Sequence, residues 1–213
     1  MTDKKEFFAA FRENVTPYLK EVGFKGSAPR WVATNDFGDE CIIGVEFDAG
    51  WVPPKALIEM AAVPKAWEEW MRGPYSSVSL EPMTKRTMHY HGLILGTPKG
   101  AGVDRDGFWP IDDTHKSTVL MCDSLQNYLP RFKKEALDRD ALHRKIRSGK
   151  FKPYGYLRNV PHLREVALIA LFPSDDEADE ARETLREYRG TPRWEKLISA
   201  TLDWDSSRSD SGD

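Results

Sequence analysis

The sequence predicts an α+β fold, in which an antiparallel sheet of about five to six strands carries helices on one face and is followed by a C-terminal helical extension. Three observations support this fold class. Apolar residues recur at helical spacing near the N-terminus and again after Asp113. Between these two stretches lie short apolar runs that are separated by turn residues. The last third of the chain again has a helical pattern. We expect a core domain over 1–135, a helical extension docked on it over 138–204, and a disordered tail over 205–213.

The first helix is expected over residues 3–22. Asp3 and Glu6 have the spacing of a capping box, in which each side chain binds an otherwise unpaired backbone N–H group. Pro17 lies inside this stretch, and because proline lacks the N–H donor it should kink the helix or restart it. The apolar positions at helical spacing are Phe7, Phe11, Val15, Leu19 and Val22.

Extended segments are expected in the next part of the chain. Residues 30–35 and 40–49 flank the turn-rich sequence DFGD, which predicts an antiparallel hairpin, and residues 55–63 should form a third strand. The sequence KAWEEWM, residues 65–71, is typical of a short helix. Two further short strands are expected within 76–82 and 88–96.

A glycine-rich loop over 96–107 leads to the second long helix. The sequence GTPKGAG in this loop lacks the order of a phosphate-binding loop, and a flexible connection is the better interpretation. From Asp113 an apolar stripe at helical spacing runs to Phe132 and is broken only near Pro130. This helix and the first one should cover the same face of the sheet, because each has one apolar stripe to bury.

The remainder of the chain predicts four helices, over 139–150, 159–172, 174–190 and 191–204. The second of these helices contains the apolar run VALIALF. Leaving this run exposed to water would be unfavourable, so the extension should dock on the core. The third should begin with a capping box formed by Ser174 and Glu177.

Composition narrows the function classes. The 213 residues carry a net charge of −3, with 31 % charged and 40 % apolar residues, which is typical of a globular protein and argues against a strongly basic nucleic-acid binder. The sequence has neither an apolar run of the roughly 18 to 20 residues needed for a membrane helix nor a signal-peptide core, so we expect a cytoplasmic protein with no membrane partner. Cys41 and Cys122 lie in apolar runs and are expected to be buried rather than joined in a disulfide.

The order of several motifs resembles a known bacterial family. These motifs are EVGFKG (21–26), RWVATN (30–35), CIIGVEF (41–47), ALIEMAA (56–62) and FWPIDD (108–113). In this order they resemble the domain-of-unknown-function family 4304, over roughly residues 3–135. The resemblance implies a bacterial α+β domain and, as the family name states, no assigned function. The chain departs from the family in the 96–107 loop, and no functional residue is carried over.

Two histidines raise the question of a metal site. His89 and His91 would point to the same face of a strand, because side chains alternate along it. Zinc needs at least a third protein ligand, for which Asp112, Asp113 and His115 are the candidates. The alternative is a pair of polar side chains on a wet strand face, and we favour it because no third ligand lies nearby in the sequence. A metal-dependent enzyme centred on His89 and His91 is therefore kept as an alternative hypothesis. The favoured interpretation expects no metal and no other cofactor.

A second alternative is nucleic-acid binding through the basic segment 131–164, which has eleven lysines and arginines against three acidic residues. The candidate residues are Arg144, Lys145, Arg147, Lys150, Lys152, Tyr154 and Tyr156, in which aromatic rings that could stack on bases lie among phosphate-pairing cations. The competing interpretation is a solvated helix face that is balanced by the acidic stretch 173–213.

The favoured function is a non-enzymatic protein-binding module, of an immunity or regulatory type. No nucleophile motif is present, so an enzyme is disfavoured but not excluded. Tryptophan is enriched among the residues that dominate protein interfaces. The candidates are Trp51, Trp67, Trp70 and Trp204, which lie beside polar or proline-rich segments.

Overall fold

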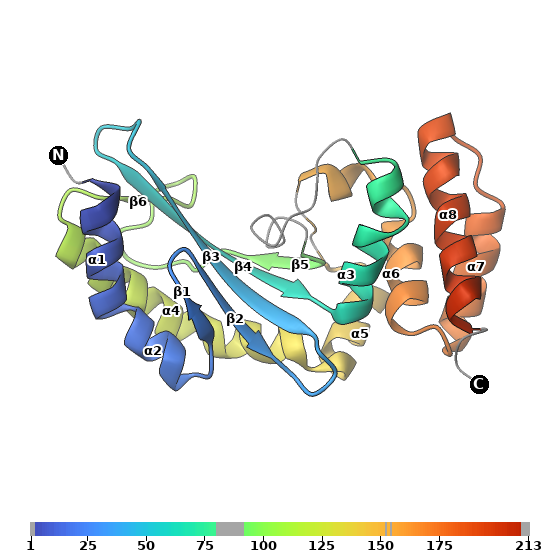
Figure 1. Cartoon of the computed structure of the whole chain (residues 1–213), viewed down its shortest axis with the longest axis horizontal. Coiled ribbons are helices and arrows are strands. Elements are labelled where there is room, and N and C mark those ends of the chain that lie inside the picture. Colours follow the sequence, from blue (N-terminus) through green and yellow to red (C-terminus); the bar gives the residue numbers. More distant parts are fainter. Residues whose placement is uncertain (1–2, 80–91, 152, 154, 210–213) are drawn as a thin grey trace. The chain divides into compact units, whose positions relative to one another are not determined.

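The computed structural model describes residues 3–79, 92–151, 153 and 155–209 (Figure 1). The chain forms two compact units. The first comprises Met1–Ala62 and Leu95–Leu137, and the second comprises Val63–Ile94 and Asp138–Asp213. Each unit is therefore built from two separate stretches of sequence.

The first unit contains an antiparallel sheet and the helices that cover one of its faces. Its helices are α1 (Lys4–Asn14), α2 (Thr16–Glu21) and α4 (Thr114–Leu137), and its strands are β1 (Lys25–Ser27), β2 (Arg30–Thr34), β3 (Glu40–Asp48), β4 (Lys55–Val63), β5 (Ile94–Gly96) and β6 (Trp109–Pro110). The strand order is β1-β2-β3-β4-β5, and β6 pairs with the start of β4. This confirms the predicted α+β class and the hairpin, in which Trp31 is opposite Ile43.

Helices α1 and α4 pack on the same face of the sheet, as expected from their apolar stripes (Figure 1). Trp31 and Phe47 belong to this face because they have the same alternation as Ile43. The ring of Phe11 lies 5.2 Å from that of Trp31, and the ring of Phe7 stacks on Phe47 at 4.9 Å. These aromatic contacts form the core between helix and sheet.

Proline has different effects in the two long helices. Before Pro17 the first helix ends at Asn14 and α2 restarts at Thr16, one of the two expected outcomes. The expected break near Pro130 does not occur, because α4 continues through this residue to Leu137. Pro130 is exposed, so water can bind the carbonyl group that loses its helical partner.

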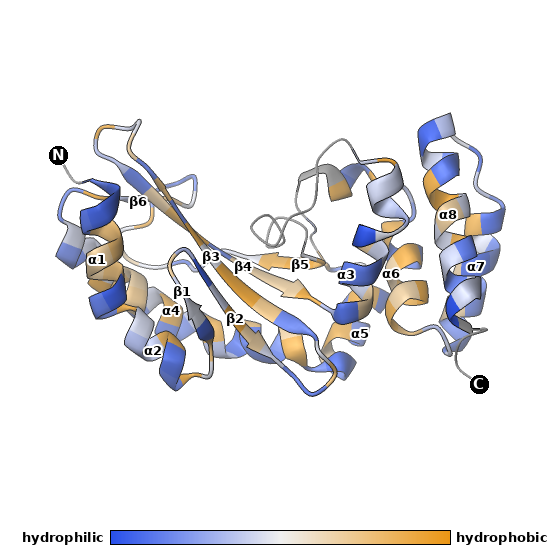
Figure 2. Cartoon of the chain, in the orientation of Figure 1, coloured by the Kyte–Doolittle hydropathy of each residue, from blue (hydrophilic) through white to orange (hydrophobic). Residues whose placement is uncertain are grey.

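The second unit is helical. It comprises α3 (Lys65–Arg72), the short 3-10 helices η1 (Tyr75–Ser77) and η3 (Gly155–Asn159), and α5 (Arg139–Arg147), α6 (Leu163–Leu171), α7 (Asp176–Arg186) and α8 (Pro192–Ser209). Helix α6 is buried along most of its length and packs against α3, α5, α7 and α8 (Figure 2). The VALIALF run is therefore the core of this unit.

The boundaries differ from those expected in two places. Residues 63–94 were assigned to the core domain by sequence but belong to the second unit. Residues 205–209 were expected to be disordered and instead form the last turn of α8. The docking of the extension on the core stays a prediction. No helix in the described parts of the chain is both long and apolar enough to cross a membrane.

Candidate functional site

The most exposed apolar surface of the first unit lies at the tip between β3 and β4. Trp51 is 54 % exposed and Val52 is 96 % exposed, although both are large apolar residues. They lie in the loop that joins the ends of the two strands, Asp48 and Lys55, at the upper left of Figure 1. We call residues 48–55 the tryptophan tip.

Asp48 binds the N–H group of the indole ring. One of its carboxylate oxygens accepts a 2.8 Å hydrogen bond from the backbone N–H of Gly50 and so closes the turn. The other accepts a 3.0 Å hydrogen bond from the indole N–H of Trp51. The polar group of the side chain is thereby satisfied within the tip, while more than half of the residue stays in contact with solvent.

Lys55 lies over the face of the ring. Its ammonium nitrogen lies 4.5 Å from the centre of the Trp51 ring and 5.6 Å from that of Phe108, within the range of cation–π attraction. It also donates a 2.8 Å hydrogen bond to Asp104. The lysine is thus held by two rings and a carboxylate at the base of the tip.

The turn 104–108 completes this support. The second carboxylate oxygen of Asp104 accepts hydrogen bonds from the backbone N–H groups of Asp106 and Phe108, at 3.0 and 2.9 Å. The hydrogen bond from Lys55, together with these backbone donors, holds the pKa of Asp104 below its ordinary value. Asp104 is therefore the ionised partner that positions Lys55 under Trp51.

The other three candidate tryptophans are placed differently. Trp67 and Trp70 are fully buried, and their rings stack at 4.7 Å in the core of the second unit. Their position corrects the expectation that they could lie at the surface. They occupy the inner face of α3 with Met71, at the i, i+3, i+4 spacing of a buried helix stripe. Trp204 is half-buried, with the Arg208 guanidinium 4.5 Å from its ring.

The proposed metal ligands are not brought together within the described residues. His89 and His91 lie outside these residues. Asp112 and Asp113 are exposed at the start of α4, and the Nδ1 atom of His115 lies 3.2 Å from the side-chain amide of Asn14. Across the described parts of the chain, no group of three or more His, Cys, Asp or Glu side chains could hold a metal ion.

Part of the basic segment contacts acidic residues inside the second unit. Arg147 forms a 2.8 Å ion pair with Glu177 at the start of α7, and His143 lies 3.2 Å from Asp175. Arg144 and Lys150 are exposed and Lys145 is half-buried. Lys152, Tyr154 and the side chain of Tyr156 lie outside the described residues. The ion pair of Arg147 fits the interpretation that acidic residues of the 173–213 stretch balance this basic helix face. The spacing of residues in the sequence could not reveal this pair.

Glu59 is a buried acid that sequence analysis missed. It is 7 % exposed in the middle of β4, and burial, reinforced by the nearby charge of Glu46, raises its pKa to about 7. The one sequence signal is a glutamate inside the apolar run ALIEMAA. Perturbed acids cluster at active sites but also occur in structural positions, so this group alone defines no chemistry.

The two cysteines offer no nucleophile. Both are buried and free. Burial raises the pKa of Cys41 to about 12 and also raises that of Cys122. Because the thiolate is the reactive form, the raised pKa values disfavour both thiols as nucleophiles.

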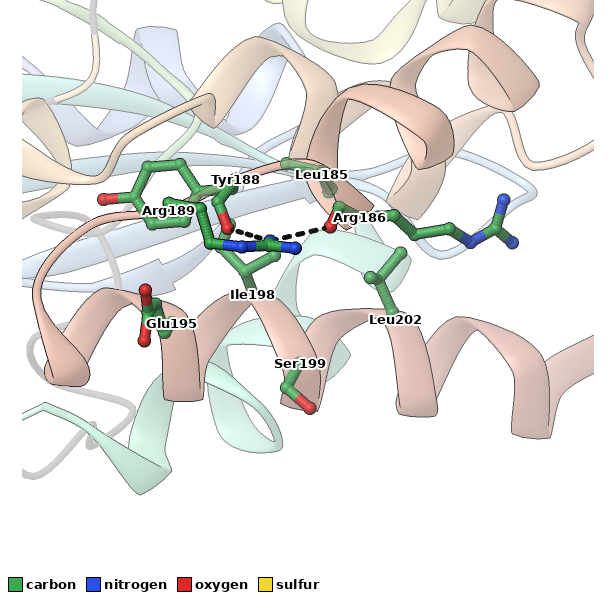
Figure 3. A pocket seen from close by; sticks show the side chains of 8 residues that line it. All are labelled: Leu185, Arg186, Tyr188, Arg189, Glu195, Ile198, Ser199 and Leu202. Carbon is green, nitrogen blue, oxygen red and sulfur yellow. Dashed lines mark hydrogen bonds between the residues drawn. The ribbon is translucent and has the colours of Figure 1, made fainter.

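A groove between α7 and α8 contains side chains that serve the fold (Figure 3). The Arg189 guanidinium donates to the backbone carbonyls of Arg186 and Tyr188, at 3.1 and 2.7 Å, and so satisfies groups left unpaired at the end of α7. Glu195 accepts a hydrogen bond from the N–H of Gly190 and closes the loop to α8. In Figure 3 the Arg186 side chain points away from Arg189, so the two arginines do not converge on a ligand.

Comparison of the sequence with family models and with curated proteins, and of the structure with solved structures, gives no match. The resemblance to the domain-of-unknown-function family 4304 therefore stays a prediction.

Proposed function

We propose that the protein is a protein-binding module whose main contact is the tryptophan tip. The observation that carries the proposal is an exposed tryptophan whose indole N–H is bound by Asp48 and whose ring face is covered by the ammonium group of Lys55. Interface residues that contribute most to affinity are typically large aromatics that a partner buries completely. A side chain that is ordered before binding loses less entropy when the partner arrives.

Val52 extends the apolar surface beside the indole ring. A valine that is 96 % exposed contributes nothing to the packing of the unit, so its apolar surface is available to a partner. A partner with an apolar pocket rimmed by polar groups would fit this tip. The immunity-type or regulatory role stays an expectation within this class.

Site-specific photo-crosslinking in the native host tests the proposal. A photoreactive phenylalanine analogue replaces Val52, and the same analogue replaces Phe37 as a matched control, because Phe37 is 62 % exposed at the tip of the β2–β3 hairpin. We expect one saturable crosslinked product from position 52 and none of the same mass from position 37. The product should disappear when Trp51→Ala is added. Identical products from both positions, or a product that persists without Trp51, would contradict the proposal.

A further inference from the structure

The second unit contains an open cavity of about 540 Å³ where the chain leads into α6. This volume is within the roughly 300 to 1,000 Å³ typical of small-molecule sites. The residues that shape it are Phe151, Pro153, Leu157, Arg158, Leu163 and Arg164. The cavity is unrelated to the tryptophan tip, which belongs to the first unit.

One side of the cavity is apolar. Leu157 and Leu163 are buried, and Phe151 and Pro153 are half-buried. A surface of this kind favours the apolar or planar body of a ligand, because water gains little from contact with it. An aromatic side chain also offers a face on which a nucleic-acid base can stack.

The polar groups of the cavity are two arginines, and none of the described residues that line it is acidic. The Nε–H group of Arg158 donates to the carbonyl of Pro153 at 3.2 Å, and that of Arg164 donates to the carbonyl of Arg147 at 3.3 Å. These bonds tether both guanidinium groups to the backbone. Arg164 also pairs with Glu165 at 3.1 Å through Nη1. A guanidinium has five N–H donors, so these bonds occupy only part of the Arg164 fork.

The start of α6 adds a third feature, the N-terminal end of a helix. His162 is its N-cap residue in the left-handed region, with φ 52° and ψ 35°, and its side chain makes no capping hydrogen bond. The imidazole instead meets the Tyr188 ring edge-to-face at 5.4 Å, and its Nδ1 atom lies 3.7 Å from a carboxylate oxygen of Glu165. The first N–H groups of a helix have no intrahelical partner and lie at the positive end of its dipole. Leu163 and Arg164, which line the cavity, are the first two residues of α6.

We propose that this cavity binds a small phosphorylated ligand with a planar or apolar body, of the nucleotide class. The phosphate binds between Arg158 and Arg164 at the start of α6, and the body lies against Phe151, Leu157 and Leu163. Two guanidinium forks and a helix N-terminus suit a dianionic phosphate better than a single carboxylate. The ligand is a free nucleotide or the end of a single strand, since both present the same chemistry.

Isothermal titration calorimetry on the full chain tests the site with three probes: AMP, inorganic phosphate and a short oligothymidine with a 5′-terminal phosphate. We expect AMP to bind, and Arg158→Gln and Arg164→Gln each to weaken binding by about tenfold or more, which is typical when a hydrogen bond to a charged group is lost. Arg186→Gln is the matched control, because Arg186 is an exposed arginine of the same unit outside the cavity. It should leave the affinity unchanged. Phe151→Ala should weaken AMP and leave inorganic phosphate unaffected.

Thermal unfolding of each variant verifies that it is folded. If a glutamine variant does not fold, Arg158→Lys and Arg164→Lys keep the charge but lose the planar fork, and both should still weaken AMP. If oligothymidine binds more tightly than AMP, the ligand is the end of a single strand. If AMP binds more tightly, the ligand is a free nucleotide. No binding of any probe at millimolar concentration, an equal loss in Arg186→Gln, or phosphate binding as tight as AMP overturns the proposal.

Discussion

At the scale of single residues, packing alone does not explain the positions of the exposed Trp51 and the buried Glu59. Trp51 leaves most of its apolar surface in water, and Glu59 keeps an ionisable group away from it. Burial disfavours the charged form of a carboxyl group, which is the main reason for the raised pKa of Glu59. Folding would be more favourable with a polar residue at the exposed position 51 and with an uncharged residue at the buried position 59.

Glu59→Gln should change how stability depends on pH. Because the pKa of Glu59 is raised from 4.5 to about 7 in the folded protein, the buried carboxyl group costs no ionisation penalty below pH 4.5, and stability is lost as the pH rises to 7. The loss is on the order of 3 kcal/mol for a shift of this size. Glutamine is uncharged throughout, so the variant should be more stable than the parent at pH 8 by roughly 1 to 3 kcal/mol.

Urea unfolding at pH 5 and pH 8 measures this difference. The exposed Glu21→Gln removes the same charge from α2 and should leave the pH dependence of the parent unchanged. A Glu59→Gln variant with the same pH dependence as the parent would show that Glu59 is ionised in the folded protein without penalty.

The order of the tryptophan tip gives a second residue-scale prediction. Asp48→Ala removes the acceptor of the Trp51 indole N–H, so this proton should exchange faster with water and its NMR resonance should shift. Asp106→Ala is the control, since Asp106 is exposed and contributes to the 104–108 turn its backbone N–H, which alanine keeps. Unchanged exchange in Asp48→Ala would mean that the indole is not held as described.

At the scale of elements, periodicity predicts most helices and strands, and the errors have identifiable causes. Strands β2, β3 and β4 were visible because apolar runs meet turn residues at both ends. Strand β1 was missed because its three residues, Lys25–Ser27, are all exposed and leave no apolar signal. The capping box of Ser174 and Glu177 was wrong, because α7 begins one residue later with Asp175 as its N-cap.

The misplacement of Trp67 and Trp70 has the same kind of cause. Their polar neighbours in KAWEEWM suggested exposure, yet on a helix those neighbours point the other way. The candidate site could be predicted only in part, since the sequence singled out Trp51 but not its support. Asp104 lies far from Lys55 in the sequence, and their 2.8 Å hydrogen bond depends on how β6 pairs with β4.

The contact between α3 and α8 gives an element-scale prediction. The Trp70 indole N–H donates a buried 2.9 Å hydrogen bond to the Thr201 hydroxyl. Thr201→Val keeps the shape of the side chain but leaves the indole N–H unpaired, so the free energy of unfolding should fall by about 1 to 3 kcal/mol. Thr184→Val changes an exposed threonine of α7 in the same way and should have little effect. Denaturant unfolding of both variants measures the difference, and equal losses would contradict the assigned role.

At the scale of the whole molecule, the chain builds two units from interleaved stretches. The sequence suggested a core followed by an extension, because helical periodicity becomes continuous after residue 138. It could not show that residues 63–94 join the later helices, because Trp70 and Thr201 are far apart in the chain and only tertiary packing brings them together. The arrangement assigns the tryptophan tip to one unit and the cavity at α6 to the other.

The affinity for the partner captured through position 52 tests the central claim most directly. It is measured with the purified partner and three proteins: the parent chain, Trp51→Ala and Phe37→Ala. A tryptophan that dominates an interface contributes 2 kcal/mol or more, so Trp51→Ala should raise the Kd by about 30-fold or more, whereas Phe37→Ala should leave it within about threefold. Equal affinities for all three proteins, or an equal loss in both variants, would contradict the assignment of the tryptophan tip as the binding site.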